Sequence, residues 1–162
     1  TFSVFLPVSG ETQPGVRAEA YSPGLASGRG TVLVADDDTQ VQDMVFRALE
    51  RSGYSGILVD NGVEAVERYR SNRDGIDLVV LDMIMPRMGG RECLIHLREM
   101  DPRVRVLVMT GYTSDGSAED LMELGAMRVI QKPFELQAFT KAVRTAVEGA
   151  EAVPDPRRRE TH

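Results

Sequence analysis

Five short apolar runs recur along the middle of the chain, and each ends at a polar residue. They are rich in Val, Leu and Ile, are too short to form helices, and lack the strict alternation of half-exposed strands. Continuous apolar runs of this length are typical of strands buried on both faces of a sheet. The pattern therefore predicts strands at residues 31–35, 57–59, 78–81, 104–109 and 127–130.

Helical periodicity follows the first of these runs. Val41, Val45 and Leu49 recur every four residues, as on the apolar face of an amphipathic helix. Thr39 and Gln42 have the residue types and the spacing of a capping box, which would make Thr39 the N-cap of this helix.

Four more helices are expected between and after the other strands. Asn61 is placed to cap the second, weaker patterns cover residues 91–99 and 117–124, and residues 136–147 carry a clear apolar period. Five strands and five helices then alternate strictly along the chain. This order predicts an α/β fold, a doubly wound parallel sheet of five strands with five helices on its two faces.

Polar side chains stand where four of the predicted strands end. Asp36 and Asp37 follow the first strand, Asp82 the third, Thr110 the fourth and Lys132 the fifth. The carboxyl ends of parallel strands lie at one edge of a sheet, where ligands of such folds bind. We therefore expect three carboxylates, a hydroxyl and an ammonium to converge at this edge.

Carboxylates gathered in this way repel one another unless a cation lies between them. Magnesium is suited to the place, because it binds one or two carboxylates together with waters and phosphate oxygens. Such a set of groups favours phosphoryl transfer, which needs positioning and charge neutralisation more than covalent machinery. A carboxylate is also able to act as the nucleophile and form an aspartyl-phosphate.

Composition narrows the class of protein further. The net charge is −6, which argues against direct nucleic-acid binding. The single cysteine, Cys93, excludes an internal disulfide and fits a reducing compartment. No apolar run approaches the roughly 18 residues that a membrane helix needs. We therefore expect a cytoplasmic protein without membrane contact in this chain.

The chain resembles the receiver (response-regulator) domain of bacterial two-component signalling in its stretches VLVADDD, DLVVLDMIMPRMGG, VLVMTGYT, LGA and VIQKPF. The resemblance covers residues 30–149. It implies a flavodoxin-like sheet with strand order 2-1-3-4-5. It also implies a phosphoacceptor function, in which the domain takes a phosphoryl group from phosphohistidine and changes shape.

The resemblance implies a role for each matching carboxylate. Asp82 would be the phosphoacceptor. Asp37 and Asp82 would bind Mg²⁺ directly, together with the backbone carbonyl of Ile84, and Asp36 would bind it through a water. Mn²⁺ is a possible substitute for Mg²⁺. Asp38 is assigned only a helix-capping role.

The resemblance also implies roles for the residues after the last two strands. Lys132 would bind the phosphoryl group, and Thr110 would swing toward the phosphoryl oxygens as a switch. The bond between Lys132 and Pro133 would be cis.

The chain departs from the family pattern at several places. An aromatic switch residue is common three positions before the lysine, where this chain has Val129, so a switch must rely on Thr110 and the loop and helix after it. Gly89 replaces a frequent Asp. Ile84 and Tyr112 flank the route of an attacking water and are apolar or bulky, which predicts slow hydrolysis of the acyl-phosphate.

Two other classes of protein fit the sequence less well. A phosphotransferase of the haloacid-dehalogenase type needs the pattern DxD after its first strand, whereas Asp36 and Asp37 are adjacent and Asp82 is followed by Met83. A flavin or nucleotide module would carry GxGxxG or GxxxxGK[ST] after a strand, and neither motif is present there. His96 and Cys93 are assigned to packing or surface positions.

The first residues suggest the setting of this receiver. Residues 1–7, TFSVFLP, resemble the last strand of the ATP-binding domain of sensor histidine kinases, and the Pro- and Gly-rich residues 8–29 resemble a linker. We expect residues 150–162 to form a disordered tail. The hypothesis is a C-terminal receiver of a hybrid kinase, and the alternative is a free-standing single-domain response regulator.

The expected partner in either setting is a protein that carries phosphohistidine. It would be the dimerisation domain of a histidine kinase or a histidine phosphotransfer protein. The receiver itself would be a monomer or a weak, phosphorylation-dependent dimer.

Overall fold

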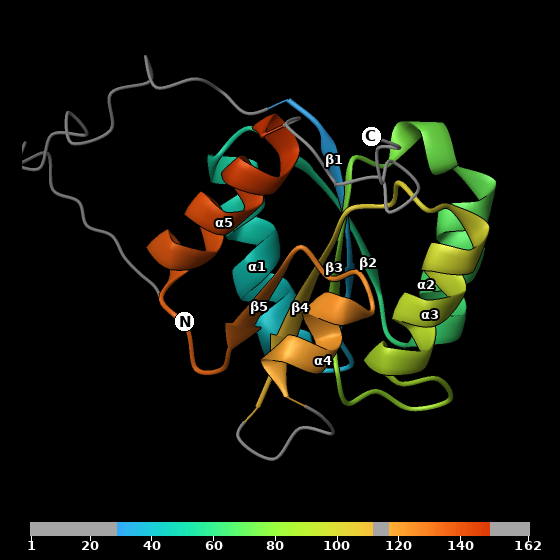
Figure 1. The fold of residues 1–162 in the computed structure, drawn as a ribbon. Helices are drawn as coiled ribbons and strands as arrows, with labels where there is room; N and C mark the ends of the chain where they lie inside the picture. Colours follow the sequence, from blue (N-terminus) through green and yellow to red (C-terminus); the bar gives the residue numbers. More distant parts are fainter. Residues whose placement is uncertain (1–28, 112–116, 150–162) are drawn as a thin grey trace, which may run out of the picture.

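A computed structural model of the chain describes residues 29–111 and 117–149 (Figure 1). Five parallel strands form one sheet in the order β2-β1-β3-β4-β5, as the resemblance implied. The strands are β1 (Thr31–Ala35), β2 (Ser55–Val59), β3 (Leu78–Asp82), β4 (Val106–Thr110) and β5 (Arg128–Gln131).

Helices cover both faces of this sheet, which confirms the predicted doubly wound fold. Figure 1 shows α1 and α5 on one face and α2 and α3 on the other. The helices are α1 (Thr39–Arg51), α2 (Gly62–Ser71), α3 (Gly90–Met100), α4 (Ala118–Glu123) and α5 (Leu136–Glu148), with a short 3-10 helix η3 (Arg73–Gly75) before β3.

The sheet is buried on both faces because its strands are apolar throughout. In β1, Val32 and Val34 pack in the core layer under α1 and α5, while Leu33 and Ala35 pack in the layer under α2, α3 and α4. All residues of β3 and β4 are buried. The missing alternation of these runs is thus explained by helices on both sides.

Four strands differ from their predicted bounds, β3 and β5 by no more than one residue at an end. The strand predicted from residue 104 begins at Val106, since the backbone N–H of Val104 donates to the carbonyl of Asp101 in a turn. The strand predicted from residue 57 begins earlier, at Ser55. Gly56 within it has no side chain, and the ring of Phe46 occupies the space that a side chain would take.

The predicted capping box of the first helix is wrong. Asp38 is the N-cap, and its carboxylate accepts hydrogen bonds from the backbone N–H groups of Gln40 and Val41. Thr39 is the first residue of α1 and not its N-cap. The side chain of Gln42 is buried and bonds to the carbonyl of Asp36. The capping role of Asp38 is confirmed. Asn61 caps α2 as predicted, because its side chain accepts from the N–H of Glu64.

The proposed segments at residues 1–7, 8–29 and 150–162 lie almost wholly outside the described residues, which include only residue 29 of them. Over the described part of the chain, no helix has both the length and the apolar character needed to cross a membrane.

Candidate functional site

The predicted polar residues lie at the carboxyl edge of the sheet, on both sides of the point where strand order reverses. β1 lies between β2 and β3, so the chain leaves β1 toward one side and returns on the other. Asp36 directly follows β1, and Asp82 is the last residue of the neighbouring β3. Ligands of open α/β sheets bind at such a reversal point.

Lys132 joins these two strands through its ammonium group. Its Nζ lies 2.8 Å from Asp36 Oδ2 and 3.1 Å from Asp82 Oδ1. The side chain of Asp36 is fully buried, and its other oxygen, Oδ1, accepts the backbone N–H of Asp38 at 2.9 Å. One cation therefore holds two carboxylates that would otherwise repel each other.

The charges of the site shift the pKa values of its members. Burial raises the pKa of Asp82, and the charge of Asp36 raises it further, while the Lys132 ammonium opposes both effects without cancelling them. Burial alone would lower the pKa of Lys132, but the carboxylates of Asp36 and Asp82 raise it above its ordinary value. Lys132 thus stays charged, and Asp82 bears a net cost when it ionises.

The carboxylates of Asp36, Asp37 and Asp82 form an acidic cluster. One oxygen from each lies within 4.8 Å of the others, and Asp37 is exposed while Asp36 and Asp82 are buried. All three donors are hard oxygens, the ligands that Mg²⁺ prefers. The residues present therefore fit a magnesium ion, with Asp37 on the solvent side.

Close packing behind Asp82 fixes its backbone. A Cβ at Gly90, the first residue of α3, would collide with the carbonyl oxygen of Asp82, so α3 approaches β3 only with glycine there. Gly89 is the N-cap of α3 and supplies no side-chain hydrogen bond, where an Asp would have done so.

The β4–β5 side of the site is also in place. Thr110 ends β4 and is buried, and its hydroxyl donates to the carbonyl of Gly111 at 2.9 Å. The backbone N–H of Lys132 donates to the carbonyl of Thr110 at 2.7 Å, which extends the pairing of β4 and β5. The peptide bond between Lys132 and Pro133 is cis, as the resemblance implied.

Three residues that were assigned tuning or switch roles have different surroundings. Ile84 lies in the loop after β3 and is 61% exposed, more than any other large apolar residue that the structure describes. Val129 lies in β5 and packs against the core layer under α2, α3 and α4. Tyr112 lies outside the described residues.

One residue near the site, Gln42, was misassigned from the sequence. Its side-chain amide nitrogen Nε2 lies 2.6 Å from the carbonyl oxygen of Asp36, 3.1 Å from that of Val59 and 2.9 Å from Asp60 Oδ1. A signal was present, because Gln42 lies three residues before Val45 and seven before Leu49, on the buried stripe of α1.

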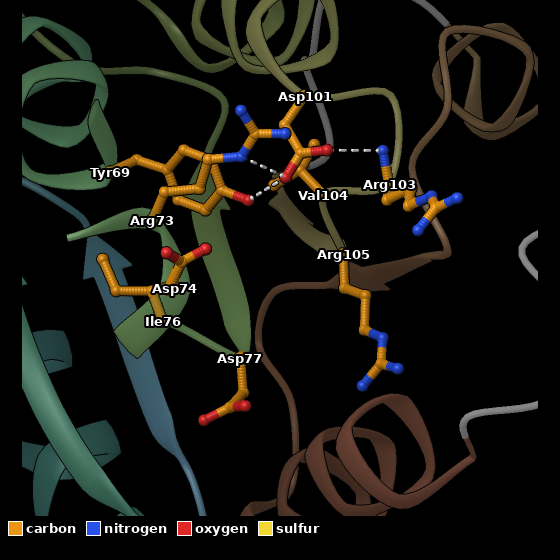
Figure 2. A pocket seen from close by; sticks show the side chains of 9 residues that line it. All are labelled: Tyr69, Arg73, Asp74, Ile76, Asp77, Asp101, Arg103, Val104 and Arg105. Carbon is orange, nitrogen blue, oxygen red and sulfur yellow. Dashed lines mark hydrogen bonds and ion pairs between the residues drawn. The ribbon is translucent and has the colours of Figure 1, made fainter. Parts of the chain in front are cut away.

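A second polar pocket lies at the opposite edge of the sheet, before β3 and β4. Figure 2 shows Asp101 between Tyr69 and Arg73 on one side and Arg103 on the other. The Tyr69 hydroxyl donates to Asp101 Oδ2 at 2.7 Å, Arg73 Nε to the same oxygen at 3.0 Å, and the Arg103 backbone N–H to Oδ1 at 2.9 Å. These contacts tie α2, η3 and the loop after α3 together.

The charge of Asp101 is stabilised by this network. Burial alone would raise the pKa of its carboxyl, but the hydrogen bonds from Tyr69, Arg103 and Arg73 outweigh burial and lower it. Its own burial, and then the hydrogen bond to Asp101, raise the pKa of Tyr69. The pocket therefore contributes to stability rather than to the acidic site.

Comparison with known protein families agrees with the residues of the site. The model of the family described as response regulator receiver domain matches residues 32–144. Apart from Thr31, the first residue of β1, this range includes all five strands, and it contains the whole acidic cluster with Lys132.

Curated relatives share this region. Sensor kinase CckA of Brucella abortus (strain 2308) is 33% identical over 122 residues, which cover 75% of this chain and 13% of the kinase. Response regulator MprA of Mycobacterium sp. (strain KMS) is 36% identical over 113 residues, 70% of this chain and 48% of the regulator. The chain thus spans less than half the length of either relative. Sporulation initiation phosphotransferase F of Bacillus subtilis (strain 168) is 31% identical over 113 residues, 70% of this chain and 90% of the relative.

Solved structures share the fold. A response regulator receiver domain protein from Clostridium thermocellum matches with a TM-score of 0.70 and 26% identity, over 74% of this chain and 95% of that one. A chain of the CheX-CheY-BeF3-Mg²⁺ complex from Borrelia burgdorferi matches with a TM-score of 0.68 and 28% identity, over 72% and 87% of the two chains.

The raised pKa of Asp82 predicts that its charge destabilises the fold when Mg²⁺ is absent. Asp82→Asn should therefore increase the free energy of unfolding at neutral pH, and the gain should shrink as pH falls and the wild-type carboxyl becomes protonated. Urea unfolding with a chelator present measures this. Saturating Mg²⁺ should reduce the gain, since the ion stabilises only the protein that binds it. An Asn variant that is less stable than the wild type without Mg²⁺ would contradict the account.

The lowered pKa of Asp101 predicts the opposite pH dependence. Its contribution to stability is complete above the unfolded-state pKa and is lost as pH falls through the folded-state pKa. Asp101→Asn should cost about 1.5–3 kcal/mol at neutral pH, as is usual for hydrogen bonds to a charged group. Denaturant unfolding from neutral to acidic pH should show the two proteins converging. A difference that stays constant with pH would mean that the charge of Asp101 is not involved.

Proposed function

Because the chain belongs to the response regulator receiver domain family, we propose that Asp82 is the residue that accepts the phosphoryl group. Receiver domains are the phosphoacceptors of two-component signalling. The observation that carries the assignment is the position of Asp82 at the end of β3, 3.1 Å from the ammonium of Lys132 and inside the acidic cluster. Asp36 is fully buried behind it, and Asp37 lies on the solvent side.

Mg²⁺ is the cofactor we propose for this cluster. Asp37 and Asp82 would bind it directly with the backbone carbonyl of Ile84, and Asp36 would bind it through a water. The structural neighbour from Borrelia burgdorferi was solved with BeF3 and Mg²⁺. When bound, the ion neutralises the carboxylates and the phosphoryl oxygens so that they can approach each other.

The residues of the chain then promote the transfer by holding the reacting groups in position. A carboxylate oxygen of Asp82 forms a bond to the phosphorus of phosphohistidine, while the phosphorus–nitrogen bond breaks and its electron pair returns to the imidazole. Lys132 already lies within ion-pair distance of Asp82 Oδ1 and would contact the phosphoryl oxygens once they are attached. The raised pKa of Lys132 keeps it cationic for this role.

The conformational response would begin at Thr110. Its hydroxyl donates to the carbonyl of Gly111, the first residue of the loop between β4 and α4. Turning toward a phosphoryl oxygen would break this bond and release the loop. Val129 is too small and too well packed in β5 to act as a rotating aromatic switch, so the response rests on Thr110 and α4.

The larger protein is proposed to be a hybrid sensor histidine kinase with this receiver at its C-terminus. Support comes from the similarity to CckA and from the kinase-like stretch at residues 1–7. The alternative is a single-domain regulator. It is supported by the match to sporulation initiation phosphotransferase F, which covers 90% of that protein. The donor in both settings would be phosphohistidine on a kinase or a phosphotransfer protein.

Replacement of Asp82 should abolish phosphorylation. Incubation with Mg²⁺ and phosphoramidate, whose phosphorus–nitrogen bond resembles that of phosphohistidine, should add one phosphoryl group to the wild type. Asp82→Asn should add none, because no nucleophilic carboxylate remains at the end of β3. Intact-mass spectrometry measures the product, with Asp74→Asn at the opposite edge as the control. Undiminished labelling of the Asp82 variant would refute the assignment.

Ile84 should lengthen the life of the acyl-phosphate. Its exposed apolar side chain cannot orient an attacking water, whereas an amide at this place would do so. Ile84→Asn should therefore shorten the phosphoryl half-life severalfold, measured by the decay of the phosphorylated mass after the donor is removed.

Met122→Gln provides the control for this effect, since it replaces another exposed apolar residue, on α4. Its half-life should equal that of the wild type. Equal half-lives for all three proteins would rule out the tuning role of Ile84.

A further inference from the structure

The backbone that carries Asp36 is held by a side chain of α1. Gln42 is 7% exposed, and its amide nitrogen lies 2.6 Å from the carbonyl oxygen of Asp36. The same nitrogen lies 3.1 Å from the carbonyl of Val59, which also accepts the backbone N–H of Asp36 at 3.1 Å. Gln42 therefore closes a small hydrogen-bonded ring between the ends of β1 and β2.

This ring completes the fixation of Asp36. The carboxylate is held by Lys132 at Oδ2 and by the backbone N–H of Asp38 at Oδ1, while Gln42 and Val59 hold the peptide groups on either side of the Cα. A buried charge is tolerated when its polar atoms are satisfied in this way. Removal of one of these contacts would let the loop that carries Asp36 and Asp37 shift.

The third neighbour of Gln42 sets a limit on these bonds. A primary amide has two N–H groups, whereas Nε2 faces three acceptors, the third being Asp60 Oδ1 at 2.9 Å. The carboxylate of Asp60 thus competes with the two carbonyls for the same hydrogens. Its loss should leave the bonds from Gln42 to Asp36 and Val59 intact or stronger.

We propose that Gln42 is a positioning residue of the phosphorylation site, which fixes the backbone of Asp36 and thereby sets the Mg²⁺ affinity of the acidic cluster. This inference rests on the proposed function. Gln42 would not touch the ion or the phosphoryl group. Outer residues that orient metal ligands commonly change metal affinity by about 10-fold or more when replaced.

The test is a titration of the full chain with Mg²⁺. NMR monitors it through the resonance of the backbone amide of Asp38, which donates to the carboxylate of Asp36. Gln42→Met keeps the length and bulk of the side chain but removes its donors. It should weaken Mg²⁺ binding by about tenfold. The rate of phosphorylation by phosphoramidate should return to that of the wild type once Mg²⁺ saturates the variant.

Two control variants separate positioning from general destabilisation. Val143→Ala leaves a cavity under α5, away from the acidic cluster, and should lower stability without changing the Kd for Mg²⁺. Asp60→Ala removes the competing acceptor and should bind Mg²⁺ at least as well as the wild type. A Kd for Gln42→Met within twofold of the wild type would overturn the proposal, as would an equal loss of affinity in Val143→Ala.

A measurement on the wild type covers the case in which Gln42→Met does not fold. The side-chain NH₂ resonances of Gln42 should shift during the titration with the same Kd as the amide of Asp38, and their invariance would refute the coupling. The two proposals fail in different ways. Phosphorylation that is lost in Asp82→Asn, with unchanged Mg²⁺ affinity in Gln42→Met, would refute only the role of Gln42. A wild type that binds no Mg²⁺ would overturn both.

Discussion

The site depends on the packing of several carboxylates around one ammonium. Lys132 bonds to both Asp36 and Asp82, and Asp37 completes the cluster from the solvent side. Attraction to Lys132 does not fully offset burial and mutual repulsion, so the pKa of Asp82 remains raised. The site therefore keeps a net negative charge that favours binding of a divalent cation, at the place where the phosphoryl group would be attached.

The fold makes this arrangement possible because its sheet is parallel and reverses order beside β1. Asp36 and Asp82 are far apart in sequence, yet they end neighbouring strands. The apolar strands between two helical layers hold those ends in place, while the two polar networks described above lie at the edges of the sheet. The two edges differ in consequence. At the carboxyl edge the charges are crowded and destabilising, whereas the Asp101 network at the amino edge is satisfied and stabilising.

Much of this was predictable from the sequence, and the exceptions have physical causes. The apolar runs predicted the strands. Asp36, Asp82 and Lys132 could be predicted as site residues because the carboxyl ends of parallel strands lie at one edge of the sheet. Gln42 was assigned to a local cap because local rules cannot reveal an acceptor on another strand, such as the carbonyl of Val59. The start of β2 was missed because Gly56 has no apolar side chain and is covered by Phe46 from α1.

The central claim is that one carboxylate of the acidic cluster, Asp82, accepts the phosphoryl group. The most direct test is to phosphorylate the wild type with phosphoramidate and Mg²⁺, reduce it with borohydride and map its peptides by mass spectrometry. Borohydride converts an aspartyl-phosphate to homoserine. The account predicts homoserine at position 82 alone. Homoserine at Asp36 or Asp37, or a phosphoryl group retained on His96, would contradict it.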